Sequence, residues 1–235
     1  LELDEAGPST QAHLDRCLTC RNCETTCPSG VEYHKLLDIG RAALETRVKR
    51  SPGEKLLRNG LRSLLPNPRV FKFLLGTGRF LKPVLPARLA SKLPRQIAPA
   101  GERPGLRHAR RVLMLEGCVQ PGLSPNTNAA ASRVLDRLGI SVQPISEAGC
   151  CGAVDYHLDA QEAGLERARR NIDAWWPHIE AGAEAIVQTA SGCGAFVKEY
   201  GYMLRNDPTY AEKARVVSER ALDLFEVLAK EDLEA

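Results

Sequence analysis

Long apolar runs are missing from this sequence. No stretch approaches the roughly 18 uncharged apolar residues that a helix needs to span a bilayer, and the acidic opening segment 1–10 lacks the apolar centre of a secretory signal. An initiator Met is also absent, so we expect the chain to be a piece of a longer protein. Aromatic residues make up 5% of the chain and are not interleaved with basic residues on a recognisable nucleic-acid-binding module, so we expect no nucleic acid among its partners. These absences indicate a cytoplasmic globular chain.

Cysteine, by contrast, is plentiful, with eight in 235 residues. Thiols stay reduced in the cytosol, so this number indicates metal ligands rather than disulfides. The first four are Cys17, Cys20, Cys23 and Cys27, followed by Pro28. Spacings of two, two and three residues with a trailing proline are typical of the ligand run of a bacterial four-iron four-sulfur cluster. A zinc ribbon shares the Cys-x-x-Cys pairs, but the third evenly spaced cysteine and the proline favour iron.

The last cysteine of this run has an ambiguous partner. In a two-cluster ferredoxin the fourth cysteine ligates the other cluster. Cys17, Cys20 and Cys23 then need a fourth thiolate and Cys27 needs three partners, yet the chain holds no second run. Either Cys27 closes a single cluster locally or a preceding run has been lost, and the missing start favours loss.

The other four cysteines are spread over the second half of the chain: Cys118, the adjacent Cys150 and Cys151 before Gly152, and Cys193. They follow short apolar runs that predict buried strands at 112–115, 140–145 and 185–187. Loops at the carboxyl ends of parallel strands meet at one edge of the sheet, and helices that begin beyond them favour thiolates. The sequence therefore predicts that the four thiolates converge. Four buried free thiols, or a redox-active Cys150–Cys151 disulfide, are the alternatives.

Three zones divide the chain: a ferredoxin-type segment at 1–50, a helical linker at 51–110 and a cysteine-rich domain at 111–235. Between Arg47 and Arg111 there are seventeen Lys and Arg but only two acids, which gives this basic belt a charge of +15. The whole chain has a charge of +3, so the remainder carries −12. The belt is either a docking surface for anionic lipid or an acidic partner, or a helical spacer with a solvated basic face.

The hydrophobic pattern predicts helices in all three zones. They are expected from Ser9 or Thr10 to Arg16 and at 31–49, 53–64, 68–80, 86–93, 125–138, 153–180, 192–204 and 208–230. Ser51-Pro52 reads as an N-cap followed by proline at the first helical position, and 94–108 reads as a linker. Alternation of strands and helices in the third zone predicts an α/β fold with a Rossmann-like parallel sheet covered by helices.

Four stretches of the chain resemble the iron–sulfur subunit of bacterial glycolate oxidase (glycolate dehydrogenase). They are the cysteine run at 15–30, and the segments 116–128, 148–157 and 189–201 around the later cysteines. The resemblance covers nearly the whole chain. That family carries two ferredoxin-type runs followed by two cysteine-rich domains of the Cys-Cys-Gly type, and this chain resembles the second run plus the first of these domains.

The resemblance implies an electron-transfer subunit of an oxidoreductase. Its cofactors would be a four-iron four-sulfur cluster at Cys17, Cys20, Cys23 and Cys27, and a second centre at Cys118, Cys150, Cys151 and Cys193. In the family, electrons pass from a flavin-bearing subunit, which oxidises glycolate to glyoxylate, towards membrane acceptors. We accordingly expect no catalytic residue on this chain, and Gly76-Thr-Gly78 is too short for a flavin-binding fingerprint and reads as a helix terminator.

Other functions fit parts of the same pattern. The chain would serve equally as the partner of a lactate- or glycerol-3-phosphate-type flavoenzyme, and a thiol–disulfide reductase or a zinc-stabilised interaction module are further alternatives. In disulfide-reducing members of the wider group another cysteine stands three residues before the last one, where this chain has Ala190, so conduction is favoured. Asp155 and His157 follow the Cys-Cys-Gly and are candidates for a hydrogen bond to cluster sulfur or a proton relay, although capping or packing explains them better.

Overall fold

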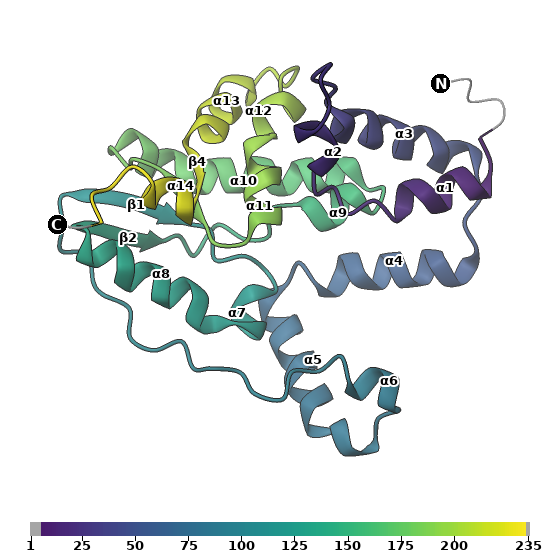
Figure 1. Ribbon diagram of the computed structural model, residues 1–235, viewed down its shortest axis with the longest axis horizontal. Helices are drawn as coiled ribbons and strands as arrows, with labels where there is room; N and C mark the ends of the chain where they lie inside the picture. The colour runs from purple at the N-terminus through teal and green to yellow at the C-terminus, as the bar shows by residue number, and fades with distance from the viewer. Residues whose placement is uncertain (1–5, 234–235) are drawn as a thin grey trace.

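A parallel sheet of four strands forms the centre of the C-terminal half of the chain (Figure 1). The computed structural model describes residues 6–233. The strands are β1 (Arg110–Met114), β2 (Ile140–Pro144), β3 (Ile186–Gln188) and β4 (Ala221–Asp223), in the spatial order β2-β1-β3-β4. In register, Val112 lies opposite Val142 and Leu113 opposite Ile186. All three pairings are parallel, so the carboxyl ends of the strands share one edge.

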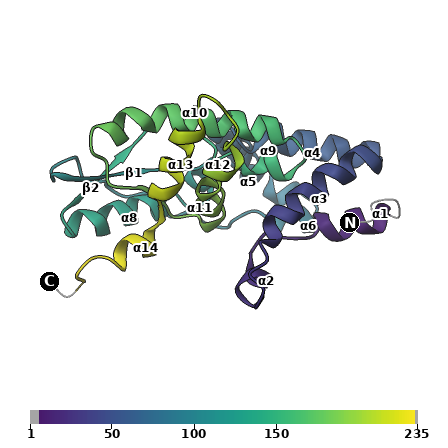
Figure 2. The same cartoon turned by 90° about the horizontal axis from the view of Figure 1, so that it is seen from above.

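Helices cover both faces of this sheet and make a three-layer domain. One face is covered by α10 (Gln161–Glu180), α11 (Ser191–Lys198) and α13 (Ala211–Arg220), and the other by α8 (Pro125–Arg137) and α14 (Leu224–Leu228). Figure 2 shows α10 and α8 on opposite sides of the strands. Because side chains alternate along a strand, Leu113 packs against α10 while Val112 and Met114 pack against α8.

The strand order creates a crevice at the carboxyl edge. From β1 the chain moves to β2 on one side, and later enters β3 on the other side of β1. Open α/β sheets bind their ligands at such a switch point, beyond the carboxyl ends of the strands. The loops after β1, β2 and β3 lead into α7 (Gln120–Leu123), α9 (Ala153–His157) and α11, and these connections carry the second set of cysteines.

The N-terminal segment is a small helical unit anchored by a buried arginine. It contains α1 (Pro8–Asp15), α2 (Asn22–Thr25) and α3 (Tyr33–Arg47). The guanidinium of Arg50 contacts Asp15 of α1 at 2.5 Å, Glu45 of α3 at 2.5 Å and Asp159, just before α10, at 2.8 Å. Arg58 also bridges Asp15 and Asp159. Arginines of the basic belt thus tie the first zone to the sheet domain.

The middle zone is helical and ends in an irregular connection. Its elements are α4 (Pro52–Leu64), α5 (Pro68–Phe80), the 3₁₀ turn η2 (Lys82–Val84) and α6 (Ala87–Ala90). Ser51 forms a capping box with Glu54 at the start of α4, as the sequence predicts. Residues 68–90, which we call the arm, extend away from the sheet domain in Figure 1. Among the helices of residues 6–233, none combines the length and apolar content needed to cross a membrane.

The predicted α/β class and parallel sheet are confirmed, with local differences. The helix expected at 153–180 is broken between α9 and α10, where Asp159 has a φ of +65° and pairs with Arg50 and Arg58. The helix expected at 208–230 is interrupted by β4, and 192–204 divides into α11 and α12 (Tyr200–Met203). Gly76 and Gly78 lie inside α5, so their interpretation as a terminator was wrong.

Candidate metal centres

The four cysteines of the second set converge, as the strand order predicts. Cys118, Cys150 and Cys151 are buried and Cys193 is partly buried. All four line one cavity of about 610 Å³, here called the inner cavity. Cys118 follows β1, the Cys150–Cys151 pair follows β2, and Cys193 lies in the first turn of α11 after β3. Residues far apart in the sequence therefore meet at the carboxyl edge of the sheet.

The sulfur atoms of this set contact one another. A hydrogen bond from the Cys118 thiol lowers the pKa of Cys150, aided by Cys151, the N–H of Gly152 and the charge of Arg167. The shared hydrogen bond with Cys150 in turn raises the pKa of Cys118 and of Cys151. A hydrogen bond with Cys151 lowers the pKa of Cys193. The order of contacts is thus Cys118, Cys150, Cys151, Cys193, with positive charge and a backbone donor facing the second of them.

Two buried polar side chains hold the Cys-Cys-Gly loop in place. Asn171 of α10 accepts a hydrogen bond from Gly149 N at 2.8 Å and donates to Cys150 O at 3.1 Å. The Tyr200 hydroxyl donates to Cys151 O at 2.5 Å. Sequence reasoning missed both residues, although Asn171 stands out as a polar residue on the apolar face of a long helix. They fix the backbone from which two of the sulfurs project.

Glycine at position 152 is required by geometry. Its φ is +101°, and a Cβ added there would lie 2.5 Å from the carbonyl oxygen of Gly164 in α10. Gly164 itself faces Tyr156, where an added Cβ would lie 2.8 Å from the Tyr156 Cβ. The two glycines let the turn after the cysteine pair lie against α10, which explains the Gly of the Cys-Cys-Gly motif.

The loops after β1 and β3 are linked by a polar network. The Gln120 amide donates to Thr189 Oγ1 at 2.5 Å and to Asn128 Oδ1 at 2.9 Å, and Thr189 Oγ1 donates to Asn128 at 2.5 Å. Asn128 also donates to the carbonyl of Glu116 at 3.2 Å. These bonds hold the Cys118 loop against the loop that precedes Cys193.

The first cysteine run lies at the surface. Cys17, Cys20 and Cys23 are exposed and Cys27 is partly buried. Thr19 and Arg21, between these cysteines, have positive φ angles of 53° and 59°, so the backbone turns sharply there. The N–H groups of Val31, Ser29 and Gly30, together with the Tyr33 hydroxyl 3.8 Å from its Sγ, lower the pKa of Cys27. Several donors facing one sulfur suit a thiolate that ligates a metal cluster.

Neither set is arranged around a single point. Within residues 6–233, no three His, Cys, Asp or Glu side chains are grouped as ligands of one metal ion. A tetrahedral zinc site needs such a grouping. A four-iron cluster instead offers a separate iron atom to each thiolate, so its ligands can stand further apart. The donor sets, all thiols, fit an iron–sulfur cluster better than zinc.

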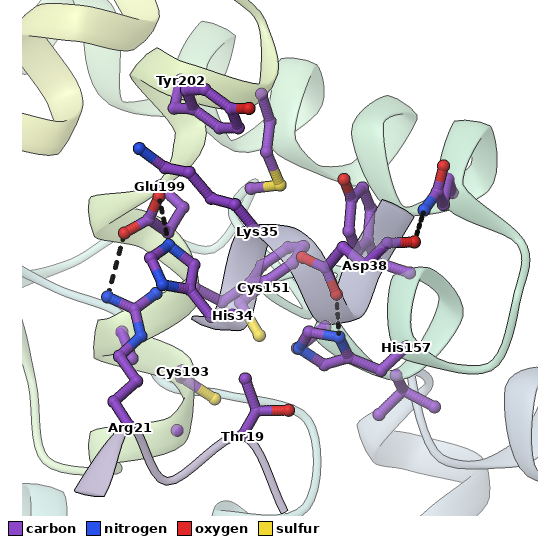
Figure 3. A pocket seen from close by; sticks show the side chains of 18 of the residues that line it. Thr19, Arg21, His34, Lys35, Asp38, Cys151, His157, Cys193, Glu199 and Tyr202 are labelled. Atoms are coloured by element: carbon purple, nitrogen blue, oxygen red, sulfur yellow. Dashed lines mark hydrogen bonds and ion pairs between the residues drawn. The ribbon is translucent and has the colours of Figure 1, made fainter. Parts of the chain in front are cut away.

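A salt bridge joins the two sets across the inner cavity (Figure 3). Arg21, between Cys20 and Cys23, contacts Glu199 at 2.9 Å, and Glu199 directly follows α11, which carries Cys193. The buried His34 lies between Glu24, at 2.7 Å, and Glu199, at 3.3 Å. Thr19 and Arg21 line the same cavity as the second set of cysteines. The first run therefore faces the second set directly.

Asp155 and His157 have different surroundings. Asp155 is buried between Arg62 of α4, at 3.2 Å, and Arg167 of α10, at 2.5 Å, so it acts in packing. His157 lines the inner cavity with its Nδ1 3.5 Å from Asp38 of α3 (Figure 3). Both residues thus join the sheet domain to the preceding zones.

Comparisons with known proteins agree with the fold. A family model described as the CCG cysteine-rich domain matches residues 112–198. The chain is 68% identical over 234 residues to the glycolate oxidase iron-sulfur subunit of Escherichia coli (strain K12), covering 100% of this chain and 58% of that protein. It is 29% identical over 259 residues to the probable glycolate oxidase iron-sulfur subunit of Bacillus subtilis (strain 168), covering 97% of this chain and 56% of the relative.

A more distant relative has another substrate in its name. Lactate utilization protein A of Bacillus pumilus (strain SAFR-032) is 26% identical over 118 residues, which is 50% of this chain and 48% of the relative. No solved structure matches the chain. Residues 112–198 therefore belong to the CCG cysteine-rich domain family, within a chain that is similar along its whole length to glycolate oxidase iron–sulfur subunits.

Proposed function

We propose that this chain conducts electrons through two iron–sulfur centres within a glycolate-oxidising complex. The observation that carries the proposal is the inner cavity, which is lined by residues of the first cysteine run on one side and by all four cysteines of the second set on the other. Two centres held there would face each other across one space, and electron exchange requires short separations. The relatives named as glycolate oxidase iron-sulfur subunits support this role.

Each set would hold one centre. Cys17, Cys20, Cys23 and Cys27 would ligate a four-iron four-sulfur cluster, and the backbone donors at Cys27 favour its thiolate. Cys118, Cys150, Cys151 and Cys193 would hold the second centre beside Arg167, whose charge offsets an anionic cluster. When bound, these clusters supply reversible one-electron chemistry. The protein residues bind them, orient them and shield the second one from water.

Substrate oxidation would take place on another subunit. We assign the oxidation of glycolate to a flavin-bearing partner and propose that electrons leave towards a membrane acceptor. Ala190, in place of a further cysteine, weighs against a disulfide reductase. The similarity to a lactate utilization protein keeps a lactate-oxidising partner as the second candidate.

The arm would contact the membrane surface. Phe73, Phe80 and Val84 are 72%, 84% and 79% exposed, and no acid occurs between residues 55 and 101, where ten Lys and Arg do. Exposed apolar side chains among basic ones are typical of segments that lie on anionic lipid. We propose that the chain divides functionally into cluster segment (1–50), basic linker (51–110) and cysteine-rich domain (111–235), and lies on the cytoplasmic face of the membrane.

Anaerobic purification followed by iron and sulfide analysis tests the proposal. We expect a brown protein whose reduced form gives two electron paramagnetic resonance signals, and Cys118→Ser should abolish only the second. A colourless protein loaded with zinc would refute electron transfer. Turnover of a disulfide substrate by the isolated chain would favour the reductase instead.

A further inference from the structure

A second hollow reaches the cysteine-rich centre from the opposite side. This outer cleft, of about 490 Å³, lies between the start of α5, the loop after β2 and the middle of α10. Cys150 lines both the outer cleft and the inner cavity. Cys150 is the one sulfur of the second set that lines the outer cleft among the residues described. The second centre is therefore approached from the surface by a route that avoids the first run.

The outer cleft is positively charged. Arg69, Arg167 and Arg170 line it, and Glu147 is the opposing acid among its described lining residues. Arg167 is engaged by the buried Asp155, which also pairs with Arg62. Within residues 6–233, the guanidinium groups of Arg69 and Arg170 make no ion pair, and both side chains are exposed. Two cationic groups are thus available to an incoming partner at the side of Cys150.

This charge fits one kind of occupant. Exposed guanidinium groups pair with carboxylates and steer acidic surfaces into place. A lipid-soluble acceptor would be excluded by a polar, arginine-lined opening, so the occupant is a protein surface. We propose that the outer cleft is the port at which an acidic face of the flavin-bearing partner docks and passes electrons to the second centre. The inference rests on the proposed function.

The step moves electrons only. One electron leaves the reduced flavin of the partner, which is oxidised by one electron, and the second centre is reduced by one electron. No covalent bond forms or breaks in this chain. The partner keeps the proton chemistry of its flavin, and two such transfers complete its oxidation. Arg69 and Arg170 would be positioning residues, since they orient the partner and do not carry the electron.

Small charged oxidants test the port without the partner. Ferricyanide is an anion and hexaammineruthenium(III) is a cation, and both accept one electron. We expect the double variant Arg69→Gln/Arg170→Gln to oxidise its second centre about tenfold more slowly with ferricyanide at low salt, as followed by rapid-freeze paramagnetic resonance. With the ruthenium complex the rate should stay the same or rise. At high salt the difference between variant and wild type should vanish, because counterions screen the charges.

A matched variant separates local from overall charge. Arg111→Gln/Arg137→Gln removes two exposed arginines at the other end of the sheet and should leave both rates as in the wild type. A second readout uses the metal-free chain: the ratio of Cys150 alkylation by anionic iodoacetate to that by neutral iodoacetamide should fall in the Arg69→Gln/Arg170→Gln variant. Because both reagents attack the same thiolate, the ratio reports access and local charge.

The possible failures are distinguishable. A wild-type chain that binds no iron at the second set would overturn the proposed function and the port together. A fully loaded chain whose ferricyanide rate and alkylation ratio do not respond to the double variant would overturn the port alone. Equal slowing with both oxidants would also overturn it, because it would indicate a structural defect rather than lost attraction.

Discussion

Arg21 and Glu199 join the surface loop of the first cysteine run to the helix that carries Cys193, with Nη1 and Oε1 2.9 Å apart. His34 adds a second contact to the same carboxylate. Since Glu199 is only partly exposed, this bridge is better shielded from solvent than most surface pairs. It fixes how the exposed loop lies over the inner cavity.

Weakening this bridge should loosen the loop. Glu199→Gln removes the charge that holds Arg21, and we expect the amides of residues 17–27 to exchange hydrogen about fivefold faster, corresponding to about 1 kcal/mol for a partly shielded pair. Peptide-level hydrogen exchange of the metal-free chain measures this. Glu212→Gln, which breaks an exposed pair with Arg215, should leave that segment unchanged. Unchanged exchange in both variants would show that the bridge does not restrain the loop.

Gly152→Ala should destabilise the cysteine-rich domain. The new Cβ would collide with the Gly164 carbonyl and strain a backbone with positive φ, so we expect a loss of about 3 kcal/mol in the free energy of unfolding. Gly182→Ala is the matched control, because Gly182 has a φ of +93° but open space around it. That variant should lose only about 1 kcal/mol. Equal losses in urea unfolding would show that the contact with α10 is unimportant.

Arg50→Met should uncouple the first zone from the sheet domain. It leaves Glu45 without this partner and weakens the anchoring of Asp15 and Asp159, and breaking a buried ion pair costs about 3 kcal/mol or more. Denaturant unfolding and limited proteolysis near residue 50 measure the effect. Arg215→Met, at an exposed arginine with two surface partners, should cost less than about 1 kcal/mol. Similar small losses in both variants would contradict an anchoring role for Arg50.

Asp136 gives the sheet domain an acid-dependent contact. Hydrogen bonding to the Arg107 guanidinium lowers the pKa of Asp136 below its ordinary value of 3.8, and His108 contributes with its Nε2 3.0 Å away. A carboxyl whose pKa is lower in the folded state stabilises that state above its unfolded pKa, and the contribution disappears as the pH falls through the folded pKa. The difference in unfolding free energy between wild type and Asp136→Asn should therefore be constant near neutral pH and shrink below pH 3.8. Urea unfolding at a series of pH values measures it, and a difference that grows in acid would contradict this assignment.

Local signals explain which parts of the fold the sequence could reveal. Ser51, Pro52 and Glu54 specify their helix start among themselves, so the capping box was predictable. Apolar runs before Cys118 and Cys193 marked buried strands, and strand geometry then brought the cysteines together. The break at Asp159 depends on Arg50 and Arg58, which are about a hundred residues away, and no local pattern encodes it.

The site was predictable to a similar depth. Cysteine positions follow from spacing and strand order, but the side chains that hold them do not. Asn171 and Tyr200 reach the Cys-Cys-Gly loop from helices distant in the sequence. β4 was missed because its three residues continue a helix-like pattern from α13 to α14 and pair only with β3.

Cys150 lines the inner cavity on one side and the outer cleft on the other. A single residue therefore forms the partition between two hollows, and along that line the protein is one side chain thick. Elsewhere the second centre is wrapped by helices and their packed side chains. The chain thus insulates its buried sulfurs everywhere except at one narrow window, and the residue that fills this window is itself a ligand.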